Sequence, residues 1–224
     1  MKKVVLITCT RIKNMEDFKN RPIFKSIEKL TNLYSLKEFD FKICSDNKIG
    51  LSEVYNSYIN NKEHINDILL FVHDDVTIKD LFLVETLNKS PYAVTGLAGT
   101  KTANLNAPPA WHLMSDKLDY VGEVMHTKED TTWTTVFGPT KTRTLLIDGL
   151  FISINVEKII NTKARFNEKF KFHHYDLAFC FECNKSKVPV GVMPISVEHY
   201  GMGDSMHSQD WINSSNEFKK EYKA

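Results

Sequence analysis

The chain has 224 residues, of which 42% are hydrophobic and 25% are charged. This composition excludes a disordered or fibrous protein, and the length allows one large domain, or one domain with an appended lobe, with a sizeable buried core. The formal net charge is +1, from 29 basic and 28 acidic residues. The net charge therefore gives no overall electrostatic attraction to nucleic acid or to an anionic membrane. A local basic patch could still bind such a partner.

No segment reaches the roughly 18 apolar residues that a membrane span requires, so we expect a soluble protein with no membrane span. The four cysteines are Cys9, Cys44, Cys180 and Cys183. Only the last two have C-x-x-C spacing, and no second pair completes a zinc site, so we interpret them as buried core thiols. Reduced thiols fit a cytoplasmic protein best.

The first 47 residues predict a strand, a helix and a second strand, the order that is typical of a βαβ unit. Residues 3–10 are rich in β-formers. Pro22 opens a helical segment over 23–34, in which apolar residues recur at three- and four-residue spacing, and residues 39–44 form the second strand.

Small polar residues and a cation follow the first predicted strand. Thr8, Thr10 and Arg11 lie at its carboxyl end, where backbone groups and hydroxyls can bind a nucleotide. An ordinary transition from strand to loop explains them equally well. In the helix predicted over 53–61, Asn56 is a poor helix former, which fits either a polar role or a position facing solvent.

The strand predicted over 68–72 contains five consecutive apolar residues, as in a strand buried on both faces of a parallel sheet. It ends in His73, Asp74 and Asp75. Open α/β sheets bind ligands beyond the carboxyl ends of their strands, and Mg²⁺ or Mn²⁺ prefers carboxylate oxygens. The pattern therefore predicts a metal and phosphate site. The structural alternative is that this acidic end caps a helix predicted over 78–88.

After a strand predicted over 92–97, residues 101–144 are rich in Thr, Pro, Trp, His and Gly and have weak periodicity. A run of this length inside a compact domain is typical of a functional lobe or lid. Trp111 and Trp133 suit stacking on the apolar face of a sugar ring. Both tryptophans could equally anchor a small subdomain.

Two further carboxylates follow in the second half of the chain. A strand is predicted over 143–154 around Asp148-Gly149, and a glycine in a strand marks a bulge or a close approach to a ligand, so we expect Asp148 to face the cleft. Asp176 lies at the start of a short apolar helix, either as its N-cap or as a carboxylate held ionised by the helix end and directed into the pocket. The last strand is predicted over 188–197, and the polar tail from Gln209 forms a surface helix or a frayed end.

No P-loop, dinucleotide-binding fingerprint or Gly-x-Ser-x-Gly elbow occurs in the sequence. The order of its motifs instead resembles the family 2-like glycosyltransferases with the GT-A fold, particularly their small bacterial and phage-type branch. The stretches that carry this resemblance are Tyr55-Asn56 and residues 71–76, 96–100, 148–151, 166–168, 172–177 and 197–201.

The resemblance covers nearly the whole chain and implies a fold. The expected fold is α/β and Rossmann-like, with a central, mostly parallel sheet flanked by helices. It implies a single domain over residues 1–224, in which a nucleotide-binding half (1–100) precedes an acceptor-binding half (101–208) and a polar C-terminal tail (209–224).

The resemblance also implies roles for single residues. Asp75 matches the ligand of a divalent metal on the diphosphate, and His199 matches a late histidine that completes the metal shell. Asp176 matches the general base of inverting members, and Asp148 is expected beside it in the catalytic site. The residues expected to bind the nucleotide sugar are Thr8, Thr10, Arg11, Asp46, Asn56, His73 and Asp74.

Two departures from the family pattern matter. The usual Asp-x-Asp motif is replaced by His73-Asp74-Asp75, which leaves open which carboxylate faces the metal. The usual Glu-Asp pair is replaced by Tyr175-Asp176, with Ala178 where a further acidic residue is common. This second departure leaves the acceptor side open.

The expected function is that of a metal-dependent glycosyltransferase of the hexosyltransferase type. It would move a sugar from a nucleotide-sugar donor, for which a UDP-sugar is expected, to a hydroxyl of a glycan, protein or other acceptor. Mn²⁺ or Mg²⁺ would stabilise the leaving diphosphate as a Lewis acid, and an aspartate would deprotonate the acceptor, which favours inversion. A nucleotidyltransferase on a similar scaffold and a non-catalytic sugar- or nucleotide-binding module are the alternatives. The glycine-rich, basic loop that is usual in nucleotidyltransferases is absent after the first strand.

Overall fold

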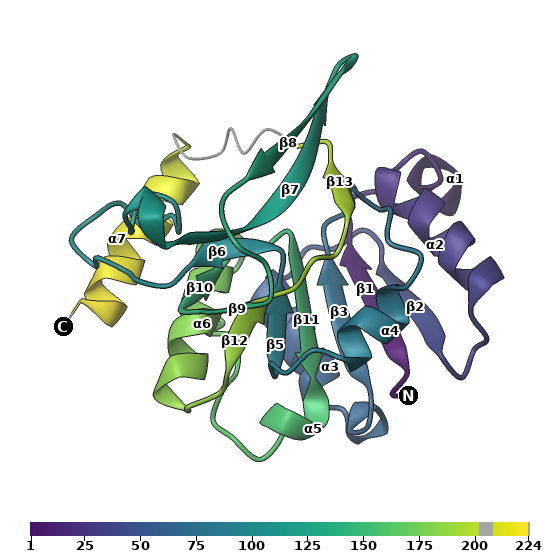
Figure 1. Cartoon of the computed structure of the whole chain (residues 1–224), viewed down its shortest axis with the longest axis horizontal. Coiled ribbons are helices and arrows are strands. Elements are labelled where there is room, and N and C mark those ends of the chain that lie inside the picture. Colours follow the sequence, from purple (N-terminus) through teal and green to yellow (C-terminus); the bar gives the residue numbers. More distant parts are fainter. Residues whose placement is uncertain (202–207, 224) are drawn as a thin grey trace.

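The computed structural model describes residues 1–201 and 208–223. In this part of the chain, two β-sheets and their helices share one hydrophobic core (Figure 1). The strands are Val4–Cys9 (β1), Phe39–Cys44 (β2), Ile68–Val72 (β3), Val76–Ile78 (β4), Val94–Gly96 (β5), Ala98–Thr100 (β6), Tyr120–Lys128 (β7), Thr131–Val136 (β8), Thr142–Thr144 (β9), Leu146–Ile147 (β10), Phe151–Asn155 (β11), Val190–Val192 (β12) and Val197–His199 (β13).

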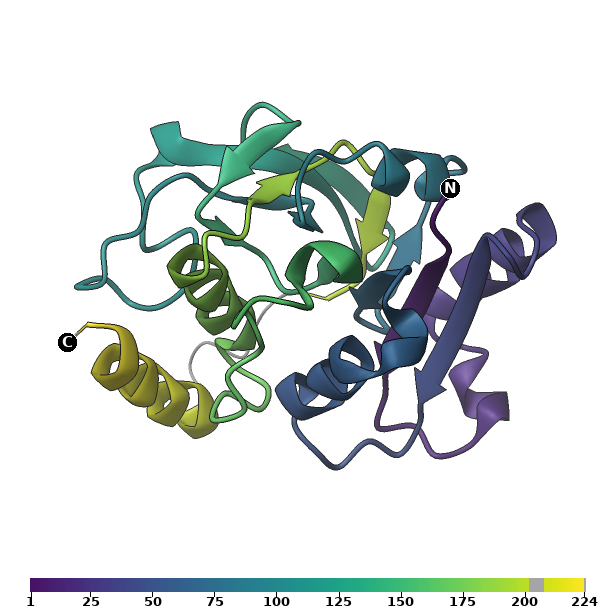
Figure 2. The same ribbon diagram turned by 90° about the horizontal axis from the view of Figure 1, so that it is seen from below.

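The helices surround these strands, and in Figure 1 and Figure 2 helix α7 lies at the opposite end of the molecule from α2. Among the described residues, no helix combines the length and the apolar character needed to cross a membrane. The helices are Met15–Phe18 (α1), Pro22–Leu33 (α2), Leu51–Asn60 (α3), Leu83–Asn88 (α4), Val156–Ile159 (α5), Tyr175–Lys185 (α6) and Gln209–Tyr222 (α7), with 3-10 turns at Lys62–His64 and Lys117–Asp119.

The larger sheet has the strand order β2-β1-β3-β11-β5-β12-β9. Strands β1, β2, β3, β5 and β12 run in one direction, and β9 and β11 run in the other. All five residues of β3 are at most 2% exposed, because β1 and β11 flank the strand and helices pack on the sheet. The expected α/β fold with a mostly parallel central sheet is confirmed, and β3 begins and ends where the apolar run predicts.

The smaller sheet has the order β10-β6-β7-β13-β4, and β8 pairs with β7 as a hairpin. In Figure 1 this hairpin projects beyond the carboxyl ends of β1 and β3, next to β13. Strand β13 runs antiparallel to β4, with His199 opposite Val76, and the backbone N–H of Tyr200 donates to the carbonyl of Asp75 at 2.9 Å. This pairing joins the carboxyl end of β3 to the last strand of the chain.

Several predicted boundaries were wrong because long-range strand pairing overrides local pattern. The helix predicted over 78–88 begins only at Leu83, with Phe82 as its N-cap, and Ile78 belongs to β4, so Asp75 does not cap a helix. The lobe predicted over 101–144 contains the β7–β8 hairpin, whose residues 131–136 are mostly exposed and therefore lack a hydrophobic period. The strand predicted over 92–97 is shortened to β5, and the strand predicted over 188–197 is divided between β12 of the larger sheet and β13 of the smaller sheet.

Helix α3 fixes the loop that precedes α6. Asn56 is only 6% exposed. Its side-chain amide donates to the Phe166 carbonyl (2.8 Å) and to Glu168 (2.9 Å), and its side-chain oxygen accepts the Phe166 N–H (2.9 Å). Ser52 donates to the Phe170 carbonyl at 2.7 Å. These bonds hold the segment that carries Lys171 and Phe172 into a pocket described below.

We expect Asn56→Ala to lower the free energy of unfolding by about 2–3 kcal/mol, because it leaves the buried Phe166 backbone groups unpaired. The matched control is Asn60→Ala on the same helix, where one exposed bond from Arg165 is lost, and we expect a cost below about 1 kcal/mol. Urea unfolding measures both. Equal losses for the two variants would contradict the role given to Asn56.

Candidate active site

The carboxyl end of β3 places two adjacent aspartates in different surroundings. Both carboxylate oxygens of Asp74 have a hydrogen-bond partner. Thr10 donates to one oxygen at 2.7 Å, and the Arg21 guanidinium donates to the other at 2.7 Å. Asp74 therefore ties β1 and the start of α2 to β3. Its oxygens are occupied, and Asp75 is left as the carboxylate of this pair that can take a further ligand.

The side chains of Asp75 and His199 face each other. Oδ2 of the aspartate lies 3.6 Å from Nε2 of the histidine, which is an ion-pair distance. Burial is the largest influence on both groups and favours their neutral forms. The charges of neighbouring groups together outweigh burial. His199 and His73 lower the pKa of Asp75 below its usual value, and Asp75 raises the pKa of His199 above its usual value. The structure thus brings together the two residues predicted to bind a metal.

The Asp75 and His199 pair fits a divalent cation. Within the described residues, Asp75 Oδ1 is buried without a hydrogen-bond partner. A Cβ atom added at Gly201 would lie 2.6 Å from Asp75 Oδ2 and 2.6 Å from His199 Nε2, so only glycine leaves the space beside both groups open. No set of three or more His, Cys, Asp or Glu side chains in the described part of the chain converges on one point. Mg²⁺ is commonly held by one or two protein carboxylates together with substrate phosphates and water, and this sparse ligand set suits that mode.

His73 is held by a hydrogen-bonded chain. Its Nε2 lies 2.8 Å from the Tyr175 hydroxyl, which itself donates to the Gly149 carbonyl at 2.8 Å. The Tyr175 hydroxyl has one hydrogen, which it donates to the Gly149 carbonyl. The Tyr175 oxygen therefore accepts a hydrogen bond from His73, whose Nε2 carries a hydrogen. Burial lowers the pKa of His73 despite the nearby carboxylates. His73 is therefore neutral at pH 7 and connects β3 to the start of α6.

Asp148 is oriented from both sides. The Trp111 indole N–H donates to Oδ2 at 2.8 Å, and the Leu150 N–H donates to Oδ1 at 3.0 Å. Trp111 is 6% exposed and meets Tyr120 and Phe137 edge-on at 5.2 and 5.0 Å between ring centroids. Trp111 thus anchors the segment before β7 and orients Asp148, whereas Trp133 is 39% exposed and stacks on His126.

Asp176 is the second residue of α6 and lines the same pocket as Asp148. The N-cap of α6 is His174, in a left-handed conformation (φ 61°), so Asp176 is not the cap. Burial, followed by the charge of Asp148, raises the pKa of Asp176 to about 7. Backbone N–H groups at the helix end oppose this change without cancelling it. The helix end thus favours the ionised form, as expected, but does not offset burial and Asp148, and the protonation of Asp176 changes near neutral pH.

Three adjoining pockets form one cleft along these residues. The Arg11 pocket (about 520 Å³) is lined by Thr10, Arg11, Asp46, Lys48 and Lys171 among others. The Asp75 pocket (about 130 Å³) contains His73, Asp74 and Asp75, and the Asp176 pocket (about 240 Å³) contains His73, Trp111, Asp148 and Asp176. Phe172 lines all three. The cleft therefore runs from the ends of β1 and β2, past Asp75, to the start of α6.

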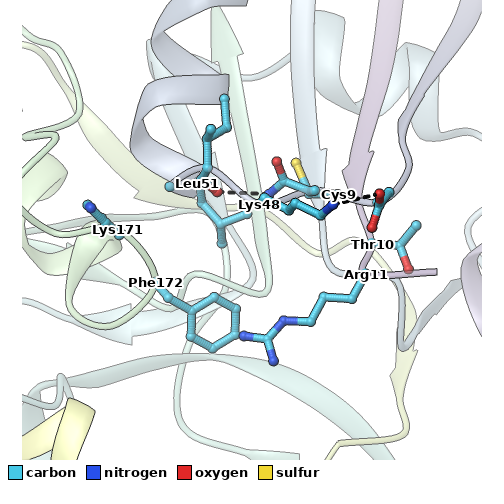
Figure 3. A pocket seen from close by; sticks show the side chains of 11 residues that line it. Cys9, Thr10, Arg11, Lys48, Leu51, Lys171 and Phe172 are labelled. Atoms are coloured by element: carbon cyan, nitrogen blue, oxygen red, sulfur yellow. Dashed lines mark hydrogen bonds and ion pairs between the residues drawn. The ribbon is translucent and has the colours of Figure 1, made fainter. Parts of the chain in front are cut away.

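Figure 3 shows the Arg11 pocket, in which the Arg11 guanidinium extends toward the Phe172 ring. The guanidinium carbon lies 5.8 Å from the ring centroid, within cation–π range. Asp46, in a left-handed conformation (φ 47°), contacts Lys48 at 3.1 Å at the end of β2. Cations and an aromatic ring thus line the end of the cleft where the sequence predicts nucleotide binding.

Three predicted site residues line none of these pockets; one of them, His199, still lies beside the cleft at Asp75, and the other two lie apart from it. Thr8 is fully buried inside β1, and its hydroxyl has no partner among the described residues. Asn56 uses its amide to hold the 166–168 segment and lines none of the three pockets. Sequence reasoning missed Arg21 as the partner of Asp74, Trp111 as the donor to Asp148, and Phe172 as the shared wall of the cleft. A contact across many residues leaves no local signal, so no pattern in the sequence indicates these roles.

The sequence matches no family model and no curated protein. Among solved structures, the chain is similar to the catalytic domain of Drosophila beta1,4-galactosyltransferase 7 in complex with xylobiose, with a TM-score of 0.50 at 9% identity over 93% of this chain and 74% of that chain. It is also similar to A197 from STIV (TM-score 0.46, 13% identity, 89% of this chain, 86% of that chain) and to HddC from Yersinia pseudotuberculosis (TM-score 0.45, 11% identity, 97% of this chain, 100% of that chain). At these identities the likeness concerns the fold alone: the chain has an α/β, Rossmann-like fold similar to that of the galactosyltransferase domain.

The raised pKa of Asp176 predicts a pH-dependent stability. Between about pH 4 and pH 7 the folded protein keeps a proton on Asp176 that the unfolded chain has lost, so stability falls as pH rises through this window. We expect the Tm of the wild type to fall more than that of Asp176→Asn between about pH 5 and pH 8, because the amide cannot ionise.

Thermal unfolding at a series of pH values measures the difference. Asp210→Asn is the matched control, since Asp210 also lies in the first turn of a helix, α7, but is exposed. Its Tm should follow the pH dependence of the wild type. Parallel curves for the wild type and Asp176→Asn would contradict the assignment of a protonated, buried Asp176.

Proposed function

We propose that this chain is a metal-dependent glycosyltransferase that transfers a sugar from a nucleoside-diphosphate sugar to an acceptor hydroxyl with inversion. The observation that carries the proposal is the continuous cleft, which has Asp75 between its two ends, His199 3.6 Å from Asp75, and Asp176 at one end. A nucleotide-sugar transferase must bind a nucleotide, a diphosphate and an acceptor in this order along one surface. The three pockets offer that order.

The donor would lie across the first two pockets. The nucleoside would occupy the Arg11 pocket, where Arg11, Lys48 and Lys171 supply positive charge beside Asp46. The diphosphate would then reach the Asp75 pocket, and Asp75 and His199 would hold Mn²⁺ or Mg²⁺ on its oxygens. When bound, the cation supplies Lewis acidity that stabilises the charge of the leaving diphosphate. We expect UDP as the nucleotide.

Asp176 is the general base of this proposal. A base works best when its pKa lies near the working pH, and a pKa of about 7 meets this condition. Asp176 would take the proton of the acceptor hydroxyl as that oxygen attacks the anomeric carbon, and a single displacement inverts its configuration. Asp148, oriented by Trp111, contributes negative charge that keeps Asp176 basic.

The acceptor would enter through the Asp176 pocket, which Trp111, His112, Phe172 and Trp211 surround with rings. Aromatic rings suit the apolar faces of sugars, so a glycan acceptor fits this end of the cleft. The galactosyltransferase similar in fold was solved with xylobiose, and a panel of mono- and disaccharides that includes xylobiose is a reasonable set of acceptor probes.

Metal-dependent nucleotide binding tests the donor half of the proposal. We expect UDP to raise the Tm in the presence of Mn²⁺ and to have little effect without it, with about 2.7 kcal/mol of added stability at a hundredfold excess over Kd. Asp75→Asn and His199→Ala should abolish this increase. Glu198→Gln is the matched control, since Glu198 contacts Thr127 and Lys79 on the other face of β13, and it should retain the increase.

Turnover tests the acceptor half. With an NDP-sugar and the acceptor panel, we expect Asp176→Asn to slow release of the nucleoside diphosphate by roughly 10²–10⁴-fold while Mn²⁺-dependent binding of UDP is kept. The wild-type rate should rise with pH up to about 7, where Asp176 loses its proton. Release of pyrophosphate from a nucleoside triphosphate and a sugar phosphate, without NDP-sugar turnover, would instead establish a nucleotidyltransferase.

A further inference from the structure

Two cysteines lie side by side at the carboxyl ends of β1 and β2, and one of them, Cys9, lines the cleft. Cys9 ends β1, Cys44 ends β2, and they are register partners in this parallel pair. Register partners direct their side chains to the same face of a sheet, and neighbouring strands lie about 4.8 Å apart. This spacing is within the Cα separation of roughly 4.4–6.8 Å that a disulfide bond requires. Both cysteines are free thiols and only partly buried.

The surroundings of the two thiols differ in a way that favours reaction. A hydrogen bond from Cys9 lowers the pKa of Cys44 to about 6, with a further contribution from the Tyr58 hydroxyl at 3.7 Å, although burial opposes the change. The same hydrogen bond, together with burial, raises the pKa of Cys9. The two sulfurs therefore differ, and Cys44 has the greater tendency to ionise to the thiolate, the nucleophilic form.

Both cysteines are partly exposed, which gives a small oxidant access to the pair. Cys9 lines both the Arg11 pocket and the Asp75 pocket, which are open parts of the cleft. The other two cysteines provide a contrast, since Cys180 and Cys183 are fully buried in α6 and burial raises the pKa of each thiol. Reactive cysteines combine thiolate character with access. Cys44 has the lowered pKa and is partly exposed, and its neighbour Cys9 faces the cleft.

We propose that Cys9 and Cys44 form a thiol modification site, which hydrogen peroxide or a related hydroperoxide converts to a disulfide. The Cys44 thiolate attacks one peroxide oxygen, the O–O bond breaks, and hydroxide leaves, which gives Cys44 sulfenic acid. The Cys9 sulfur then attacks the sulfenic sulfur, the S–S bond forms, and water leaves with the Cys9 proton. In total, two thiols and one peroxide give one disulfide and two waters.

The test is a peptide map of the wild-type protein before and after treatment with hydrogen peroxide. Trypsin places Cys9 in residues 4–11, Cys44 in residues 43–48, and both Cys180 and Cys183 in residues 172–185. We expect the first two peptides to become linked, with a loss of about 2 Da for the two hydrogens removed. The link should disappear on reduction with dithiothreitol, and residues 172–185 should stay unmodified in the folded protein.

Variants separate the two steps. Cys9→Ser should stop at the sulfenic acid, which dimedone traps on residues 43–48, and Cys180→Ser should form the link as the wild type does. Oxidation of Cys9 or Cys44 to sulfinic or sulfonic acid without a link in the wild type would overturn the proposal. Unchanged masses for both peptides after peroxide treatment would also overturn it. The wild-type map decides the question even if a variant fails to fold.

An effect of nucleotide on this oxidation rests on the proposed function, because it assumes that a nucleotide occupies the Arg11 pocket. UDP with Mn²⁺ should then slow the formation of the link, since the nucleotide covers Cys9. If the link forms at the same rate with and without UDP, the modification site stands and only the placement of the nucleotide fails. If no link forms while UDP still binds, the modification site fails and the proposed function stands.

Discussion

The antiparallel pairing of β4 with β13 is the constraint on which the site depends. Strand β3 delivers Asp75 from the centre of the larger sheet, and β13 delivers His199 from near the end of the chain. The register that sets His199 opposite Val76, closed by the bond from Tyr200 to the Asp75 carbonyl, brings their side chains to 3.6 Å. A shift of one residue would turn His199 to the other face, so the two sheets must form together for the site to exist.

The carboxylates of the cleft differ in their polar contacts, and these contacts indicate different roles. Asp74 and Asp148 have both oxygens occupied by donors from distant segments, which holds the scaffold in place. Asp75 and Asp176 differ, because Asp75 keeps a buried oxygen without a partner among the described residues and Asp176 has its pKa raised to about 7 by burial and by Asp148. Side chains with unsatisfied bonding capacity or a shifted pKa are the ones available for ligands and chemistry.

Sequence alone predicted the β1-α2-β2 unit and β3 well, because each carries its own hydrophobic period. The prediction that Asp75, His199, Asp148 and Asp176 belong to one site came largely from a family resemblance. In the structure Asp75, Asp148 and Asp176 line adjoining pockets, and His199 lies 3.6 Å from Asp75. Sequence reasoning failed for β4 and for the β7–β8 hairpin. Their residues find partners only in strands far away in the chain, and a short or exposed strand has no local pattern that distinguishes it from a helix or a loop.

The position of a bound cation is the most direct test of this account. Crystals grown with Mn²⁺ and UDP, measured on both sides of the manganese absorption edge, would give an anomalous difference peak that locates the metal independently of any assumed ligand. The account predicts one peak within bonding distance of Asp75 and His199 and of a diphosphate oxygen. A diphosphate bound in the cleft with manganese elsewhere, or with no manganese contact to either residue, would contradict it.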